Sequence, residues 1–166
     1  MDAADRQTLD RFLQAIRGMR VHRDGEGRPA LKKPLLLLLI LDRLASGKLS
    51  ENRISFSAIE EELTSLIKRF GRRTAKGSAS PEEPFVYLAT ASFWTVNYPE
   101  GTPDDRRARR SKRVLRDAGT YASLDDTLFE LLRDSGSARK EAMACVLECW
   151  AAGEAGDELR TAFGGS

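Results

Sequence analysis

The sequence has few of the residues that form disulfides or bind metals, and it has no apolar run long enough to span a membrane. The 166 residues include one histidine and two cysteines, too few for a disulfide framework or a zinc site, so we expect a reducing, intracellular setting. The longest apolar run, Leu35 to Leu41, has seven residues, whereas a membrane-spanning helix needs about 20. The first residues lack the basic-then-apolar order of an export signal. The sequence therefore predicts a cytoplasmic protein that does not associate with membranes.

The groupings typical of a catalytic centre are also missing from the sequence. His22 stands beside arginines near a loop and belongs to no metal-binding motif. The glycines at 25 and 27 have neither a strand before them nor Lys-Ser or Lys-Thr after them, so they form no phosphate-binding loop. Two adjacent aspartate pairs, at 104–105 and 125–126, are explained by helix capping. We therefore expect no catalysis, no metal and no cofactor in this chain.

Charge is distributed unevenly along a chain whose net charge is only +2. Residues 68–116 carry 12 basic and 5 acidic side chains, or +7, whereas residues 1–67 carry +1 and residues 117–166 carry −6. A concentrated basic segment on a near-neutral chain is typical of a nucleic-acid-binding protein. The alternative is a basic surface that serves only solubility.

Hydrophobic periodicity predicts that most of the chain is helical. Apolar residues recur at spacings of three and four in residues 5–20, 31–46, 57–70, 124–133 and 138–150. The helix over 31–46 is apolar on all sides, which is typical of a helix buried by other elements. It opens with Lys32-Lys33-Pro34 and is expected to end at Gly47. Ser57 and Glu60 have the spacing of a capping box.

Two short segments favour strands. Residues 53–56 alternate polar and apolar, and residues 92–98 are aromatic and β-branched, so we expect them to pair in a small antiparallel sheet. Residues 84–89 fit either a helix or a strand. Residues 71–83 are polar, which predicts a loop, and residues 104–116 predict a basic helix that begins at an aspartate pair.

Together these elements predict an α+β fold that is predominantly helical, a helix bundle with a small antiparallel, winged-helix-like sheet. The length fits one domain over residues 1–166. We expect its core at about 9–150, followed by a tail or linker at 153–166 that is rich in glycine and alanine.

Basic residues near aromatic residues are the remaining candidates for function. They are Lys32, Lys33, the basic runs at 68–76 and 106–116, and the nearby Pro84, Tyr87 and Trp94. Lysine and arginine bind phosphates, and aromatic faces meet sugars or bases. For Phe85, Phe93 and Trp94 the alternative is core packing, which we expect for at least two of the three. We expect Tyr87 to be half exposed.

Several segments, taken in order, resemble one known family. They are Lys32-Lys33-Pro34 with the leucines that follow, Arg53-Ile54-Ser55-Phe56, Arg69-Phe70-Gly71, Pro81-Glu82-Glu83-Pro84-Phe85-Val86-Tyr87-Leu88, Phe93-Trp94-Thr95-Val96 and, after a basic segment, Ala118-Gly119. Their order and spacing resemble the sulfur-binding domain of bacterial type IV, phosphorothioate-dependent restriction endonucleases, which are McrA-like HNH enzymes. The resemblance covers most of the chain.

The resemblance implies a domain that binds double-stranded DNA in which sulfur replaces one non-bridging phosphate oxygen. A separate HNH nuclease domain, further along the full-length chain, would cut the DNA, so this domain would not itself be an enzyme. Pro84 and Tyr87 would line an apolar sulfur pocket, with Lys32 and Lys33 at its edge. Sulfur is larger and more polarizable than oxygen and accepts hydrogen bonds poorly, so an apolar wall favours it through dispersion contacts.

The resemblance also implies that Arg106 and Arg109 contact the DNA backbone or base edges, where arginine reads guanine with two hydrogen bonds. Three features depart from the family. Lys32-Lys33 stands where His-Lys or His-Arg is usual, and Glu83 stands where an aromatic residue is usual. Ala91-Ser92-Phe93 stands before the tryptophan, where Asp-Gly is frequent. A carboxylate repels a phosphate, so Glu83 must turn away, pair with an arginine or accept a hydrogen bond from a base such as cytosine.

Two other functions fit parts of the same pattern. One is a protein–protein adaptor or regulator of a restriction system, whose basic face only keeps it soluble. The other is a general DNA-binding domain without a preference for sulfur. Salt-dependent binding to DNA separates the adaptor from both DNA-binding alternatives.

Overall fold

The computed structural model describes residues 1–23, 27, 29–71, 80–151 and 153–163. Within them the helices are α1 (Ala3–Arg17), α2 (Lys32–Ser46), α3 (Phe56–Leu66), α4 (Glu82–Tyr87), α5 (Arg106–Arg109), α6 (Lys112–Leu115), α7 (Asp126–Asp134), α8 (Gly136–Trp150) and α9 (Gly153–Phe163). The strands are β1 (Trp94–Asn97) and β2 (Tyr121–Leu124), with a π-helical turn, η1 (Ile67–Gly71), and a 3-10 turn, η2 (Leu88–Thr90). This arrangement confirms the expected class, a mainly helical α+β fold with a small antiparallel sheet.

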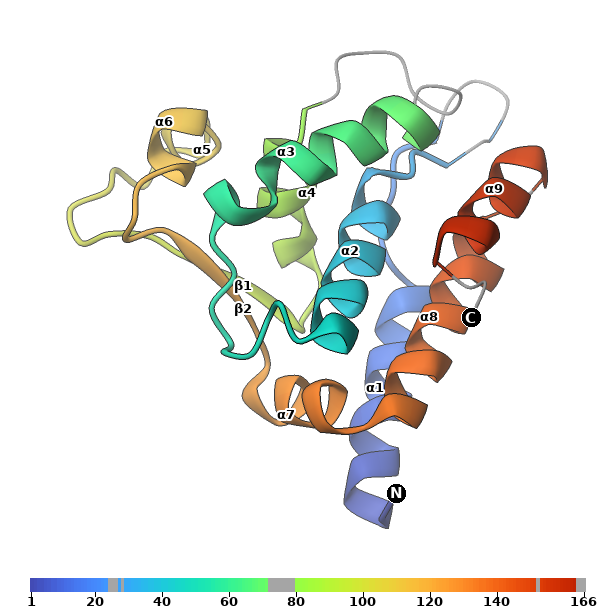
Figure 1. Cartoon of the computed structure of the whole chain (residues 1–166). Coiled ribbons are helices and arrows are strands. Elements are labelled where there is room, and N and C mark those ends of the chain that lie inside the picture. The colour runs from blue at the N-terminus through green and yellow to red at the C-terminus, as the bar shows by residue number, and fades with distance from the viewer. Residues whose placement is uncertain (24–26, 28, 72–79, 152, 164–166) are drawn as a thin grey trace.

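Helix α2 lies at the centre of the molecule, in contact with α3, α4, α7 and α8 (Figure 1). Every residue from Pro34 to Leu41 is buried, as the all-apolar pattern predicted. The helix ends at Gly47, whose φ of 78° lies in the left-handed region that favours glycine. The predicted boundaries of this helix are therefore confirmed to within one residue.

Helix α1 packs along α8 through the apolar stripe that its periodicity predicted. The indole Nε1 of Trp150 donates to the carbonyl oxygen of Ile16 at 3.2 Å. The thiol of Cys145 donates to the carbonyl oxygen of Leu13 at 3.7 Å, and its burial raises its pKa to about 11. These contacts fix α1 beside α8, and the residues after α1 return toward the start of α2.

The sheet differs from the sequence prediction in one of its two strands. Strand β1 lies within the predicted segment 92–98, but its partner is β2, with Trp94 opposite Leu124 and Asn97 opposite Tyr121. The predicted strand at 53–56 is wrong, because only Ile54 forms a bridge, to Ala122 of β2, and α3 already begins at Phe56. The side chain of Phe56 is fully buried, so packing starts the helix before the strand can extend.

The predicted capping box at Ser57 and Glu60 is also wrong. Both residues lie inside α3, and Ser57 donates to the carbonyl oxygen of Arg116 at 3.4 Å. Glu60 instead accepts a hydrogen bond from the guanidinium of Arg116 at 2.8 Å, which lowers the pKa of that carboxyl. The pair ties α3 to the segment that follows α6.

Residues 84–89 are helical, in α4 and then η2, which settles the choice left open by the sequence. The indole Nε1 of Trp94 donates to the carbonyl oxygen of Phe85 at 2.7 Å. The ring of Phe85 lies edge-on to those of Phe56 and Trp94, at centroid distances of 5.3 and 5.7 Å. Phe85, Phe93 and Trp94 are all buried, so the core-packing alternative is correct for the three, and Tyr87 is half-buried as expected.

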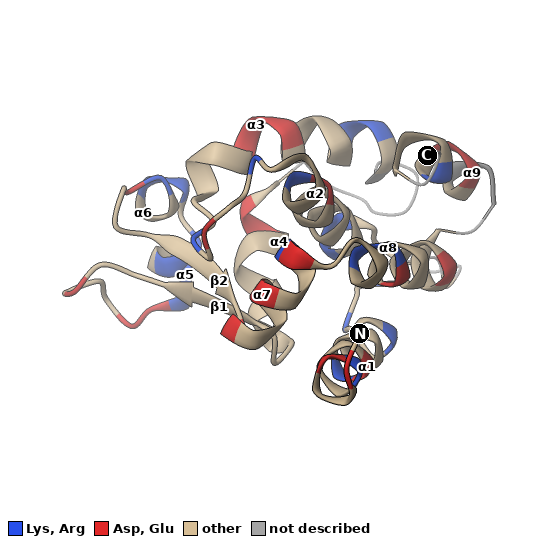
Figure 2. Ribbon diagram, turned by 60° about the horizontal axis from the view of Figure 1, so that its bottom comes forward, with Lys and Arg blue, Asp and Glu red and all other residues tan. Residues whose placement is uncertain are grey.

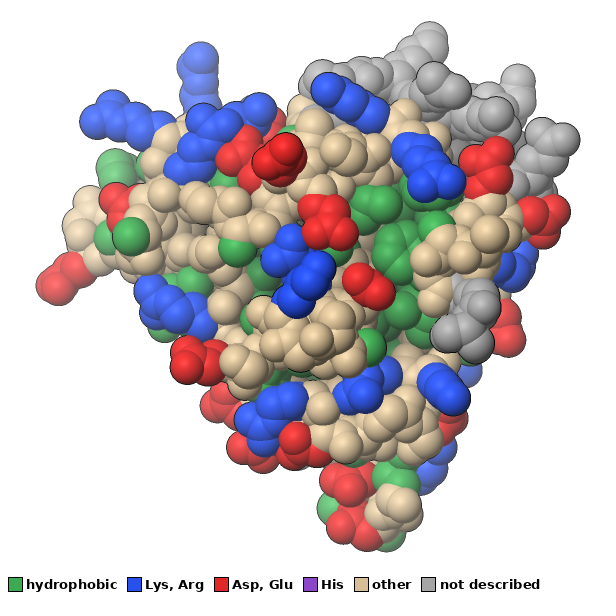
Figure 3. Space-filling model, viewed as in Figure 1, with side chains coloured by type: hydrophobic (Ala, Val, Ile, Leu, Met, Phe, Trp, Pro, Cys, Tyr) green, Lys and Arg blue, Asp and Glu red, His purple; other side chains and the backbone are tan. Residues whose placement is uncertain are grey.

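The basic segment forms two short helices, α5 and α6, where one helix over 104–116 was predicted. Asp105 caps α5 by accepting from the backbone N–H of Arg107 at 3.0 Å. Ser111 caps α6 by accepting from Val114 N–H at 3.3 Å, so the chain restarts a helix there. In Figure 2 both helices carry Lys and Arg at the end of the molecule away from α9, and in Figure 3 these side chains project from the surface.

Residues 153–163, within the segment expected to be a tail or linker, form helix α9 in contact with α8. Its Leu159 side chain is buried. Residues 72–79, the main part of the predicted loop at 71–83, lie outside the described residues, as do the glycine at 25 and residues 164–166. No helix in the described part of the chain is long and apolar enough to cross a membrane.

The buried α2 makes stability sensitive to its apolar side chains. Leu38 is 1% exposed, so Leu38→Ala leaves a cavity and should lower the free energy of unfolding by about 2–5 kcal/mol. Asp42 is exposed on the same helix, and Asp42→Ala should change that free energy by no more than about 0.5 kcal/mol. Chemical denaturation of both variants measures the difference, and equal losses would contradict the central role of α2.

Candidate nucleic-acid interface

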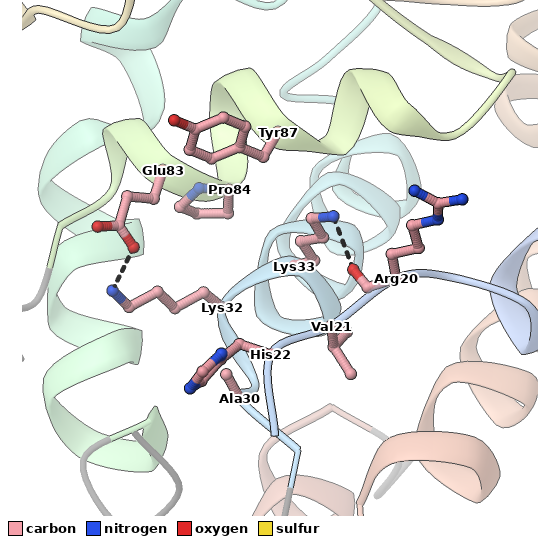
Figure 4. A pocket seen from close by; sticks show the side chains of 9 residues that line it. All are labelled: Arg20, Val21, His22, Ala30, Lys32, Lys33, Glu83, Pro84 and Tyr87. Atoms are coloured by element: carbon pink, nitrogen blue, oxygen red, sulfur yellow. Dashed lines mark hydrogen bonds and ion pairs between the residues drawn. The ribbon is translucent and has the colours of Figure 1, made fainter. Parts of the chain in front are cut away.

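A surface cavity of about 360 Å³ lies between the first turn of α2, helix α4 and the chain that follows α1 (Figure 4). Its lining consists of Arg20, Val21, His22, Ala30, Lys32, Lys33, Glu83, Pro84 and Tyr87. Five of the seven site residues predicted from the sequence are therefore brought together in one cavity, although they come from two separate segments. Arg106 and Arg109 are not in its lining.

The two helices place these side chains for local reasons. Lys32 and Lys33 open α2 just before the buried run, so they are held where the central helix reaches the surface. On α4 the buried Phe85 anchors the helix to the core. Glu83 and Tyr87 are four residues apart and therefore share one helical face, with Pro84 beside them. The sequence spacing on both helices thus determines which residues meet.

Glu83 forms an ion pair with Lys32 at the edge of the cavity. The Lys32 Nζ and a carboxylate oxygen of Glu83 are 2.7 Å apart, and the two side chains are 16% and 47% exposed (Figure 4). Of the three alternatives for Glu83, the structure favours pairing with a cation, and the cation is this lysine in place of an arginine. In the free protein Lys32 therefore already has an anionic partner.

Lys33 is held by neutral oxygen atoms. Its Nζ donates to the carbonyl oxygen of Arg20 at 2.7 Å and to the Thr90 hydroxyl at 3.3 Å. Burial, with a contribution from the positive charge of Arg20, lowers the pKa of Lys33. The ammonium group thus contributes charge to the cavity while two of its N–H groups bind the protein.

The remaining lining is largely apolar. Pro84 and Ala30 are buried, and Val21 and the ring of Tyr87 are half-buried. The carbon atoms of this surface offer dispersion contacts and no hydrogen bonds, next to the two lysines that already have partners. Such a cavity suits an anion with one large, polarizable and weakly hydrogen-bonding atom.

Arg109 serves the structure of its own segment. Its Nε donates to the carbonyl oxygen of Pro103 at 3.0 Å, and its guanidinium carbon lies 4.6 Å from the ring centroid of Tyr98. The Tyr98 hydroxyl in turn donates to the carbonyl oxygen of Arg109 at 2.9 Å. Arg106, by contrast, is exposed at the start of α5.

Sequence reasoning did not predict the role of Arg110. Its Nη1 donates to the Tyr87 hydroxyl at 3.1 Å, which connects the basic segment to the cavity. Arg20 and His22 in the lining were also not predicted. Their position in a basic cluster shortly before Lys32 was the available signal, but only the fold shows that this chain returns to the start of α2.

Other predicted contributors lie elsewhere. Trp94 belongs to the core. Most of the basic run at 68–76 lies outside the described residues. Of its basic residues the structure describes Lys68 and Arg69, and both are exposed. Among the described residues no three His, Cys, Asp or Glu side chains are grouped so that they could hold a metal ion.

Comparison of the sequence with models of known protein families identifies one family. Residues 9–164 match the model described as the ScoMcrA-like DNA sulfur-binding domain. No curated protein matches the sequence.

Solved structures have the same fold. The sulfur-binding domain of SprMcrA complexed with phosphorothioated DNA is 24% identical, with 96% of each chain covered and a TM-score of 0.74. The sulfur-binding domain of ScoMcrA complexed with phosphorothioated DNA is 23% identical, with 84% of this chain and 86% of that chain covered and a TM-score of 0.69.

The type IV phosphorothioation-dependent restriction endonuclease ScoMcrA is also 23% identical, with a TM-score of 0.67, but this chain covers only 29% of it. At these identities the likeness establishes a shared fold. The match to the family model over nearly the whole sequence establishes more: the chain belongs to the ScoMcrA-like family of DNA sulfur-binding domains.

Proposed function

We propose that this domain binds double-stranded DNA through a phosphorothioate linkage whose sulfur enters the cavity between α2 and α4. The observation that supports this most directly is the lining: Pro84 and Tyr87 form an apolar wall beside Lys32 and Lys33. The family and the DNA complexes of its solved members support the same ligand.

Sulfur is favoured because the ring carbons of Pro84 and Tyr87 offer no hydrogen bonds. The sulfur atom gains dispersion contacts with the Pro84 ring and the Tyr87 ring. An oxygen atom in the same place would lose its water partners without replacement, at a cost of about 1–3 kcal/mol, or roughly five- to 150-fold in affinity.

The cations around the cavity offset the charge of the phosphodiester. Lys33 and Arg20 supply positive charge on one side of the cavity. Lys32 supplies it on the other side, where the carboxylate of Glu83 partly neutralises this lysine. Arg110 bonds to Tyr87 and so places α5 beside the modified linkage. In this proposal Arg106 contacts backbone or base edges, and Arg109 holds the segment that presents it.

In the full-length protein the domain would bring a separate HNH nuclease domain to modified DNA in the cytoplasm. The relation to full-length ScoMcrA, of which this chain covers 29%, supports such a division between a binding domain and a nuclease. The domain itself would contribute affinity and selectivity and no bond cleavage.

A gel-shift titration tests this function with one duplex in three forms: unmodified, and with a single phosphorothioate in each of its two stereoisomers. We expect one stereoisomer to bind more tightly than unmodified DNA. Equal affinity for all three forms would reject sulfur recognition and leave general DNA binding. No salt-dependent binding to any form would reject both and favour an adaptor.

Charged substitutions in the apolar wall should remove the preference for sulfur. Pro84→Asp and Tyr87→Asp each place a carboxylate against the sulfur, so the affinity ratio between modified and unmodified duplex should approach one. Ala89 is exposed on η2 and outside the lining, so Ala89→Asp adds the same charge nearby and should keep the ratio. A retained preference in both pocket variants would place the sulfur elsewhere.

The negative charge of Glu83 should weaken the binding of DNA, and it should weaken the binding of unmodified duplex more than that of phosphorothioated duplex. Glu83→Gln removes a negative charge next to the phosphodiester and releases Lys32, which can then bond a phosphate oxygen. Affinity for unmodified duplex should rise roughly fivefold, because like charges near a protein surface repel by about 1 kcal/mol. Affinity for modified duplex should rise less, so the preference for sulfur should fall.

Glu62→Gln is the matched control for this measurement. Glu62 is 49% exposed and pairs with Arg43 at 2.8 Å, away from the cavity, so its loss makes the same change in net charge. Fluorescence anisotropy at fixed salt measures all four affinities. Equal gains in both variants would mean that Glu83 acts only through net charge.

A further inference from the structure

Two further hollows continue the cavity along α1. The first, of about 310 Å³, is lined by Ala15, Gly18, Met19, Arg20, Thr90, Ala91 and Ser92. The next, of about 390 Å³, includes Arg11, Phe12, Ala15, Ser92, Phe93 and Asp125 in its lining. Arg20 belongs to the cavity and to the first hollow, and Ala15 and Ser92 belong to both hollows. The three depressions therefore adjoin one another along α1 and residues 90–93, and we call the two hollows together the groove. The hydrogen bonds from Lys33 to Arg20 and Thr90 lie where the cavity meets the groove.

The groove has the chemistry of a phosphate track. Arg20 lies at its inner end and Arg11 at its outer end, both exposed, and the hydroxyl of Ser92 lies between them. The Thr90 hydroxyl also lies there, but it already donates to the carbonyl oxygen of Tyr87 at 3.0 Å. The bottom of the groove is held in place by the rings of Phe12 and Phe93, which pack edge-on with their centroids 4.9 Å apart. Arginine and hydroxyl side chains are the usual protein contacts to the DNA backbone, which carries its charge whatever the base sequence.

The two acidic residues nearest the groove, Asp10 and Asp125, each have a partner on the protein. Asp10 is paired with Arg6 at 2.7 Å on α1. Asp125 lies in the outer hollow, and its carboxylate accepts from the backbone N–H of Leu128 at 3.2 Å as the cap of α7. A phosphate would be repelled by Asp125, so the track ends at Arg11.

The dimensions match a short length of duplex. The helix from Arg11 to Arg17 is about 9 Å long at 1.5 Å per residue, and Arg20 lies beyond it. With bases spaced about 3.4 Å apart along the axis, this length corresponds to roughly three base pairs. In Figure 4, Arg20 and Glu83 lie on opposite sides of the cavity, and Arg20 is the residue that the cavity shares with the first hollow.

We infer that the groove along α1 binds the phosphodiester backbone of the DNA on one side of the modified linkage, with Arg11 as its outermost contact. This inference rests on the proposed function, because it takes the cavity as the place of the modified phosphate. It adds a second, sequence-independent binding site whose ligands are ordinary phosphates. The domain would then need several base pairs on that side for full affinity.

The experiment measures affinity as the duplex is lengthened one base pair at a time on either side of a single phosphorothioate. On one side, affinity should rise over roughly three base pairs and then level off. Arg11→Gln should abolish most of that rise, a loss of roughly fivefold at about 0.15 M salt on the long duplex and none on the short one. The slope of log affinity against log salt should fall by about one.

Arg17→Gln is the matched control, because Arg17 lies on the same helix and lines a different hollow that Arg11 also borders, but it does not line the groove. It should leave the length dependence unchanged. A loss in Arg11→Gln that is equal on short and long duplexes, or absent on both, would overturn the inference. Thermal melting of both variants excludes misfolding as the cause.

Unmodified duplexes measured in parallel separate this result from the proposed function. The groove binds ordinary phosphates, so a gain with length that depends on Arg11 should appear with or without sulfur. If the preference for sulfur is absent but the gain in affinity with duplex length remains, the proposed function is rejected and the inference about the groove is supported. If the preference for sulfur is present and the gain in affinity does not depend on Arg11, only the inference about the groove is rejected.

Discussion

The burial of α2 on all sides is the constraint on which the rest of the structure depends. A helix without a polar face must be enclosed, and α3, α4, α7 and α8 enclose it. Only its ends can then reach the surface. At the N-terminal end the enclosing elements leave a cavity, and the two lysines before Pro34 stand at its edge. The position of the site therefore follows from the way the core is closed.

Within the site, the two lysines are held by partners on the protein itself. Lys32 is paired with Glu83, and Lys33 is bonded to a carbonyl oxygen and a hydroxyl. Under the function proposed above, electrostatic attraction would hold the DNA backbone near the site, and the apolar wall of Pro84 and Tyr87 would select the backbone that carries sulfur.

Apolar patterns in the sequence predicted α1, α2, α3, α7 and α8, because each has an apolar stripe or, in α2, an apolar surface on all sides. The residues of α2 and α4 that could line a pocket came from the family resemblance and not from periodicity. Sequence patterns failed where burial or chain geometry overrides local preference. Phe56 turns a potential strand into the start of α3, and Ser111 divides the basic helix. The contacts from Lys33 to Arg20 and from Arg110 to Tyr87 join distant segments, so local patterns do not reveal them.

The order of residues at the start of α2 has an evolutionary consequence. Lys32 and Lys33 precede the buried run, so under the proposed function exchanging them would alter recognition without opening the core. The same holds for Glu83, which is half exposed beside the buried Phe85. Selectivity and stability can thus diverge independently in this scaffold. A TM-score of 0.74 at 24% identity shows that this architecture persists while most of the side chains change.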